Sequence, residues 1–202
     1  DIAPPPANGC ISLDQTTFEQ VKTRNRLDED NWSFRTGLNY KTAGAALLYA
    51  TVSKGYKSGS FPTVAATSTA QFLPVTQESV LAYETGIKAP LFANRVQVEA
   101  AAFYYDYHDK QIRGRRLDML FGPLEALVNA PESRLFGFEN SIRARTLTGL
   151  DVGVALTYTD SKVQRFVGIT PTGAMQDFAG SAIPFAPEPT ASARMVFSPS
   201  AW

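Results

Sequence analysis

Three arginines close together, Arg113, Arg115 and Arg116, are the side chains of this chain best suited to binding a ligand. A guanidinium group stays positively charged, and its N–H donors form a fork that matches carboxylate or catecholate oxygens. This cluster therefore predicts the binding of an anionic ligand. A solvated patch of surface charge explains the same residues, and the sequence leaves both interpretations open.

A second candidate group lies where the predicted strand 45–56 meets the loop that follows it, and it consists of Tyr56, Lys57 and Phe61. Aromatic side chains of this kind stack on a ligand, or they anchor a chain at the boundary between water and an apolar phase. Both roles are kept as hypotheses for this group.

The chain offers little for catalysis or for holding a metal. His108 is the single histidine, and the acids that flank it, Asp106 and Asp109, lie on opposite faces of an extended strand, which makes a poor chelate. Cys10 is the only cysteine, so no internal disulfide or cysteine cluster can form. No Gly-x-Ser-x-Gly turn occurs either. We therefore expect no catalytic residue, no metal site, no cofactor and no enzyme activity.

Composition gives no support to nucleic-acid binding, because the 19 basic and 19 acidic residues cancel. The chain also has no apolar stretch of the roughly 18 residues that a membrane helix needs. A helical membrane protein is therefore excluded.

The element that must position the arginines is the segment 95–111 just before them. It alternates strictly at first, and its two walls are Val96, Val98 and Ala100 on one side and Arg95, Gln97 and Glu99 on the other. It then ends in aromatic residues and runs well past the usual strand length of roughly 5–6 residues. A long strand with one apolar wall, one polar wall and an aromatic end is typical of a transmembrane β-barrel. We expect the apolar wall to face lipid, whereas the facing of residues 103–107 is not determined because the alternation blurs at 100–102.

Similar alternation predicts an all-β chain of about seven antiparallel strands in an up-and-down meander. The predicted strands are 31–41, 45–56, 79–88, 95–111, 135–145 in a hairpin that starts near 128, 151–159 and 189–197, with residues 1–30 as a loop or extended segment. Short turns are predicted at 42–44, 89–94 and 146–149, and long loops at 57–77, 112–127 and 163–187. Outer-membrane barrels combine short periplasmic turns with long extracellular loops. Residues 31–202 are therefore predicted to form a partial barrel, and a soluble all-β binding module, for example a carbohydrate-binding sandwich, is the alternative.

Several segments, in this order and spacing, resemble the C-terminal barrel of TonB-dependent outer-membrane receptors. They are LYATVSKGYKSGSF at 48–61, ESVLAYETGIK at 78–88, AAFYYDY at 101–107, NA at 129–130, LFGFE at 135–139 and IPFAPE at 183–188. The family's full barrel has about 22 strands around a plugged lumen. The resemblance therefore implies a piece of a transporter, and no segment here resembles the plug or the short box that engages the energy-coupling protein.

The resemblance also implies a function, which is the import of a scarce solute through the bacterial outer membrane by energised gating. The implied solute is a ferric siderophore or a similar small molecule, bound in the outer loops by Arg113, Arg115, Arg116, Tyr56, Lys57 and Phe61. The implied partners are outer-membrane lipid and, through parts of the receptor absent here, the plug domain and the energy-coupling protein. A lipopolysaccharide-facing patch is the alternative role for the arginines, and a passive porin is disfavoured.

Six charged side chains fall on the predicted inward faces, namely Glu84, Lys88, Glu99, Glu139, Arg143 and Arg145. They could line a substrate path, but we favour a ladder of opposite charges between strands, each pair worth roughly 0.2–1 kcal/mol. Inward glycines such as Gly86, Gly137 and Gly153 are expected to allow strand bending or a close contact with the plug.

Overall fold

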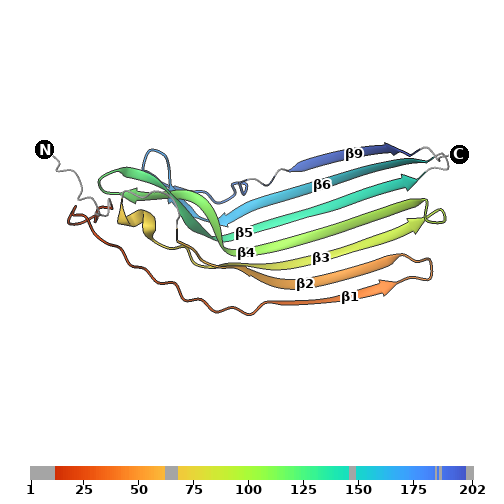
Figure 1. The fold of residues 1–202 in the computed structure, drawn as a ribbon, viewed down its shortest axis with the longest axis horizontal. Coiled ribbons are helices and arrows are strands. Elements are labelled where there is room, and N and C mark those ends of the chain that lie inside the picture. The colour runs from red at the N-terminus through yellow and green to blue at the C-terminus, as the bar shows by residue number, and fades with distance from the viewer. Residues whose placement is uncertain (1–11, 62–67, 146–148, 185, 187, 199–202) are drawn as a thin grey trace.

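The computed structural model describes residues 12–61, 68–145, 149–184, 186 and 188–198. Their main feature is one antiparallel sheet in which each strand pairs with the next along the chain (Figure 1). Its seven strands are β1 (Phe34–Lys41), β2 (Leu47–Lys57), β3 (Glu78–Leu91), β4 (Val96–Asp118), β5 (Gly122–Arg145), β6 (Leu150–Arg165) and β9 (Pro189–Phe197). The predicted all-β meander is thereby confirmed. The described residues hold no second large sheet packed on the first, so the alternative of a sandwich is wrong.

The long connections gather at one end of the sheet, which we call the looped end, and the short turns lie at the other, the turn end (Figure 1). The looped end contains a 3₁₀ helix, η1 (Thr69–Phe72), and a small hairpin of β7 (Val167–Ile169) and β8 (Met175–Asp177). Among the described residues, no helix is long and apolar enough to cross a membrane.

The prediction of a long loop at 112–127 is wrong. Strands β4 and β5 are 23 and 24 residues long and continue to pair from Lys110 and Ala130 as far as Asp118 and Gly122. The alternation signal fades here because it depends on two faces in contrasting surroundings, whereas both faces of this extension carry polar side chains. We call residues 110–130 the projecting hairpin. The predicted loop at 163–187 also begins inside β6 and contains the β7–β8 hairpin.

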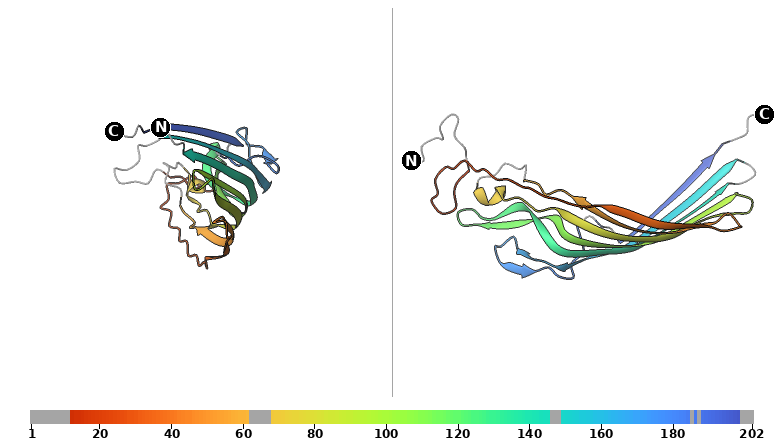
Figure 2. Two further views of the ribbon diagram at one scale, coloured as in Figure 1. Left: turned by 90° about the vertical axis from the view of Figure 1, so that its right-hand side faces the viewer. Right: turned by 90° about the horizontal axis from the view of Figure 1, so that it is seen from below.

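The sheet is curved like a piece of barrel wall (Figure 2). Its convex face is apolar and exposed, with exposed fractions of 80% for Leu38, 53% for Ile142 and 52% for Leu156. Val98 pairs with Ala89 on one side and with Ile142 on the other. The apolar wall predicted for 95–111 therefore belongs to the convex face. A protein surface this apolar needs a cover, and nothing in the described residues provides one.

The concave face is polar and holds the hollows of the sheet. The pocket lining and the strand pairing also show which face of the sheet each aromatic residue of 103–107 occupies. Phe103 and Tyr105 line a concave hollow, whereas Tyr104 pairs with Tyr83 and Phe136 on the convex face. The strand therefore keeps its alternation through the alanines at 100–102, where side-chain type gives no signal.

The buried core lies at the looped end. The described hydrophobic residues that are buried are Ala70, Val75, Ala126, Ala130, Val163 and Ile183, all near the long connections. The rest of the sheet is a single layer with no second layer packed against it, so it has no comparable buried interior.

Candidate functional site

The looped end is assembled around residues 12–33, which we call the strap. Gln15 donates a hydrogen bond from Nε2 to Asp118 Oδ2 at 3.0 Å, and Asn25 donates from Nδ2 to the Phe72 carbonyl at 3.1 Å. The strap thus connects the projecting hairpin with the loop 58–77. Residues 1–11 of the predicted N-terminal segment lie outside the described residues, and so does Cys10.

Glu29 of the strap fixes the base of the loop 58–77. Its carboxylate accepts the backbone N–H of Gly59 at 2.7 Å and that of Gln77 at 2.6 Å. Beside this contact, Ser60 and Val75 exchange two backbone hydrogen bonds of 3.1 and 3.0 Å. Glycine is required at 59 because a Cβ there would lie 2.5 Å from the Val75 carbonyl oxygen and 2.6 Å from the Glu29 carboxylate. The two ends of the loop are therefore held together.

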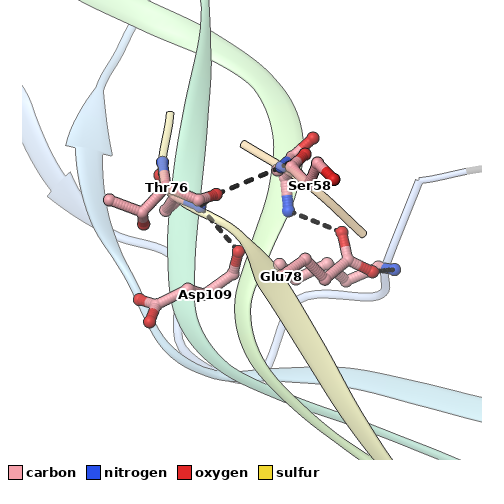
Figure 3. A network of polar contacts seen from close by, with 7 residues as sticks. Ser58, Thr76, Glu78 and Asp109 are labelled. Carbon is pink, nitrogen blue, oxygen red and sulfur yellow. Dashed lines mark hydrogen bonds and ion pairs between the residues drawn. The ribbon is translucent and has the colours of Figure 1, made fainter. Parts of the chain in front are cut away.

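The projecting hairpin fastens the same loop from the other side through a cross-strand pair, Gln111 and Asn129 (Figure 3). Gln111 donates from Nε2 to the carbonyls of Ser58 at 2.9 Å and Thr76 at 3.1 Å. Asn129 donates to the Thr76 carbonyl at 3.0 Å and accepts the Thr76 N–H at 3.0 Å. A side-chain amide is both donor and acceptor. The pair can therefore hydrogen-bond to the loop backbone as a neighbouring strand would.

Glu78 completes this network where the hairpin leaves the wall. Its carboxylate accepts the Gln111 N–H at 2.9 Å and pairs with Lys110 Nζ at 3.3 Å (Figure 3). Next to it, Asp109 adopts a left-handed φ of 52° opposite Pro131, which has no N–H to donate to the ladder. The Asp109 carbonyl instead accepts from Asn129 at 2.6 Å.

Asp118 closes the hairpin at its tip and is buried. Its Oδ1 accepts the N–H groups of Leu120 at 2.8 Å and Phe121 at 2.9 Å, and Ser68 and Gln15 also donate to its carboxylate. Burial raises the pKa of this carboxyl, but the hydrogen bonds outweigh burial, and the pKa lies below its usual value. Asp118 therefore joins the hairpin, the loop and the strap as a charged acceptor.

The three predicted arginines all lie on β4 in the projecting hairpin, but they do not form one cluster. Arg113 and Arg115 pair with Leu127 and Glu125 and share a face, whereas Arg116 points to the opposite face. Arg113 is exposed and Arg115 is half-buried. Burial lowers the pKa of Arg116, and its Nε has no hydrogen-bond partner among the described residues.

The second predicted group is also dispersed. Tyr56 lies on the convex face, with Lys54 Nζ 5.4 Å from its ring centroid, and Lys57 pairs with Glu78 across the strands. Phe61 instead lines a hollow of about 260 Å³ between the strap and the loop, together with Lys22, Thr23, Asn25 and Phe72. Sequence reasoning missed these four residues because they are distant along the chain and follow no periodic pattern.

The concave face gathers most of the charges predicted to point inward. A hollow of about 240 Å³ is lined by Glu84, Glu99, Glu139 and Lys88. Lys88 Nζ lies 3.6 Å from Glu99 Oε2, and the Tyr49 hydroxyl donates to Glu84 Oε1 at 2.7 Å. At the turn end of the sheet, Arg145 Nε lies 3.0 Å from Asp151 Oδ1. The favoured charge ladder is therefore present in part. In the hollow, three carboxylates outnumber the one ammonium group, and this negative charge suits a cationic partner.

Two glycines of this face make room for rings of the neighbouring strand. A Cβ on Gly86 would lie 2.7 Å from the Tyr49 ring, and one on Gly137 would lie 2.6 Å from Phe103. Phe103 in turn stacks on Tyr105 with ring centroids 5.2 Å apart. Each glycine therefore leaves space for a ring and for a backbone carbonyl oxygen of the neighbouring strands.

His108 lies on the convex side of β4, and its Nε2 is 3.6 Å from Asp106 Oδ2. Within the described ranges, no three His, Cys, Asp or Glu side chains are grouped so that they could hold a metal ion.

Comparisons with known proteins agree with this architecture. The family model described as "TonB dependent receptor-like, beta-barrel" matches residues 11–202. The solved structure of "Copper transporter OprC" is similar with a TM-score of 0.50 and 14% sequence identity, over 64% of this chain and 20% of that chain. The likeness to OprC shows the fold, and the chain spans about a fifth of that protein's length. The fold is an antiparallel meander with an apolar convex face, and the family model matches almost the whole chain. This chain therefore belongs to the TonB-dependent receptor β-barrel family of the bacterial outer membrane.

Proposed function

We propose that this chain is a wall segment of a TonB-dependent importer that captures an anionic chelate, most directly a ferric siderophore, and admits it by energised gating. The observation that carries this proposal is the position of Arg113 and Arg115. They share one face of a hairpin that projects beyond the apolar wall, at the end where the family's extracellular loops lie.

The charges of the projecting hairpin and of the concave hollow suit two different partners. Guanidinium groups on the projecting hairpin attract carboxylate or catecholate oxygens from outside. The acidic hollow around Glu84, Glu99 and Glu139 repels the same anion, so it suits a different partner. We assign it to cationic side chains of the plug domain, whose withdrawal by the energy-coupling protein would open the path.

The roles of the predicted site residues are then unequal. Arg113 and Arg115 are proposed as direct ligands of the anion. Arg116 faces away from them, Tyr56 anchors the convex face at the membrane boundary, and Lys57 pairs across the strand with Glu78. Only Phe61 remains as an aromatic contact from the second group.

Uptake of a radiolabelled ferric chelate by iron-starved cells tests the proposal. In the full receptor, the double variant Arg113→Ala/Arg115→Ala should weaken chelate binding roughly tenfold or more, because two charge-assisted hydrogen bonds are lost. Arg116→Ala, which removes one guanidinium group from the opposite face, is the control and should change binding much less. Wild-type uptake by the double variant would refute the assignment.

A further inference from the structure

We propose that the hollow between the strap and the loop 58–77 binds an aromatic ring that carries an anionic oxygen, such as a benzoate or phenolate group. This inference rests on the proposed function, because the group would belong to the imported solute. It adds a second contact region, separate from the arginines of the projecting hairpin.

Two aromatic rings line the hollow. Phe61 and Phe72 come from the two limbs of the loop, and both line the same space of about 260 Å³. A further ring that enters this space can stack on these rings or meet them edge to face. The volume lies below the roughly 300–1,000 Å³ of pockets for drug-sized ligands, so the hollow suits one planar group of a larger solute.

The strap supplies the charge and the polar contacts. Lys22 is exposed at the hollow, and no carboxylate of the described residues forms an ion pair with it. Thr23 adds a hydroxyl that can donate a hydrogen bond. An ammonium group and a hydroxyl beside two phenyl rings select a ring with an anionic oxygen over an aliphatic anion or a neutral ring.

The two walls are held at a fixed separation by hydrogen bonds between the strap and the loop. Asn25 ties the strap to the Phe72 carbonyl at 3.1 Å, and Glu29 ties it to the N–H groups of Gly59 and Gln77. Glu29 does not line the hollow, so it acts as a positioning residue. A ligand that bridges strap and loop would in turn stabilise this closed arrangement.

The test uses the full receptor in detergent and salicylate as the probe, followed by saturation-transfer NMR. Salicylate should bind at least several-fold more tightly than cyclohexanecarboxylate, which has the charge without the ring, and than benzyl alcohol, which has the ring without the charge. Lys22→Gln and the double variant Phe61→Ala/Phe72→Ala should each weaken salicylate binding at least fivefold. Arg24→Gln and Phe18→Ala, which alter the same strap outside the hollow, should leave it unchanged.

Glu29→Gln separates geometry from direct contact. It removes one of two acceptors and should weaken salicylate binding although Lys22, Phe61 and Phe72 are intact. Salicylate binding that survives the Lys22 and phenylalanine variants, or that falls equally in the two controls, would overturn the proposal. The arginine double variant should keep salicylate binding, so a failure of chelate uptake and a failure of this hollow are told apart.

Discussion

At the scale of single residues, the looped end depends on side chains that satisfy backbone groups of distant segments. Glu29 and Gln111 each serve two such groups, and Asp118 accepts hydrogen bonds from the distant side chains of Gln15 and Ser68. No sequence pattern predicts these contacts, because the partners lie far apart along the chain, 103 residues in the case of Gln15 and Asp118. The residue types were visible, but their joint role depends on the tertiary arrangement.

Asp118 makes the stability of the projecting hairpin depend on pH. Because its pKa is lowered in the folded state, its contribution is fully present above the usual value of 3.8 and is lost as the pH falls through the lowered pKa. Asp118→Asn should therefore speed hydrogen exchange of residues 112–127 at pH 6, after correction for intrinsic rates. The difference from wild type should shrink below about pH 3.8.

Asp28→Asn is the matched control for that experiment, because Asp28 is exposed and pairs only with its neighbour Arg26 among the described residues. It should leave the exchange of residues 112–127 unchanged at every pH. A difference between wild type and Asp118→Asn that grows on acidification would contradict the sign of the pKa shift.

At the scale of elements, alternation predicted the strands wherever their two faces meet different surroundings. The apolar wall of Val96, Val98 and Ala100 is an example, and it lies on the exposed convex face of the sheet. The same rule explains the error at 112–127, where the strands continue but polar side chains lie on both faces, so the alternation signal is lost. The fold of the wall was thus predictable, whereas the hairpin that carries the candidate arginines was not.

Strand packing on the concave face gives a prediction with a close internal control. Gly137→Ala should destabilise the receptor by about 1–3 kcal/mol, because its Cβ would overlap the Tyr158 carbonyl and the Phe103 ring. Gly153→Ala, on the next strand, should cost little, since its nearest neighbour is the Ile142 carbonyl oxygen at 3.8 Å. The unfolding temperature of the full receptor, read from heat-dependent gel migration, measures both. Equal losses in the two variants would contradict the packing argument.

At the scale of the whole molecule, the sheet has two outer strands, β1 and β9, each paired on one side only within the described residues. In lipid, an unpaired backbone N–H or C=O costs several kcal/mol, so these edges need partners. A complete barrel of this family has about 22 strands, so we expect these edges to pair with further strands of the receptor.

This arrangement predicts how the 202-residue chain behaves when it is produced alone. It should require detergent to stay in solution and should form mixed oligomers, because the apolar convex face and both edges lack cover. Size-exclusion chromatography and gel migration before and after heating would show this, with the full receptor as the control. A monodisperse monomer in plain buffer would contradict the membrane assignment of the convex face.

The looped end and the convex face tolerate different substitutions. Around Val75 and Ala130, where neighbouring side chains leave no exposed surface, a change in size must be matched by its neighbours. The convex face adjoins fluid lipid tails, which have no fixed shape, so Leu38 or Ile142 can change in size as long as the side chain stays apolar. Such a wall can exchange most of its residues over evolutionary time and keep its form, which is how barrels with as little identity as this chain and OprC can share one architecture.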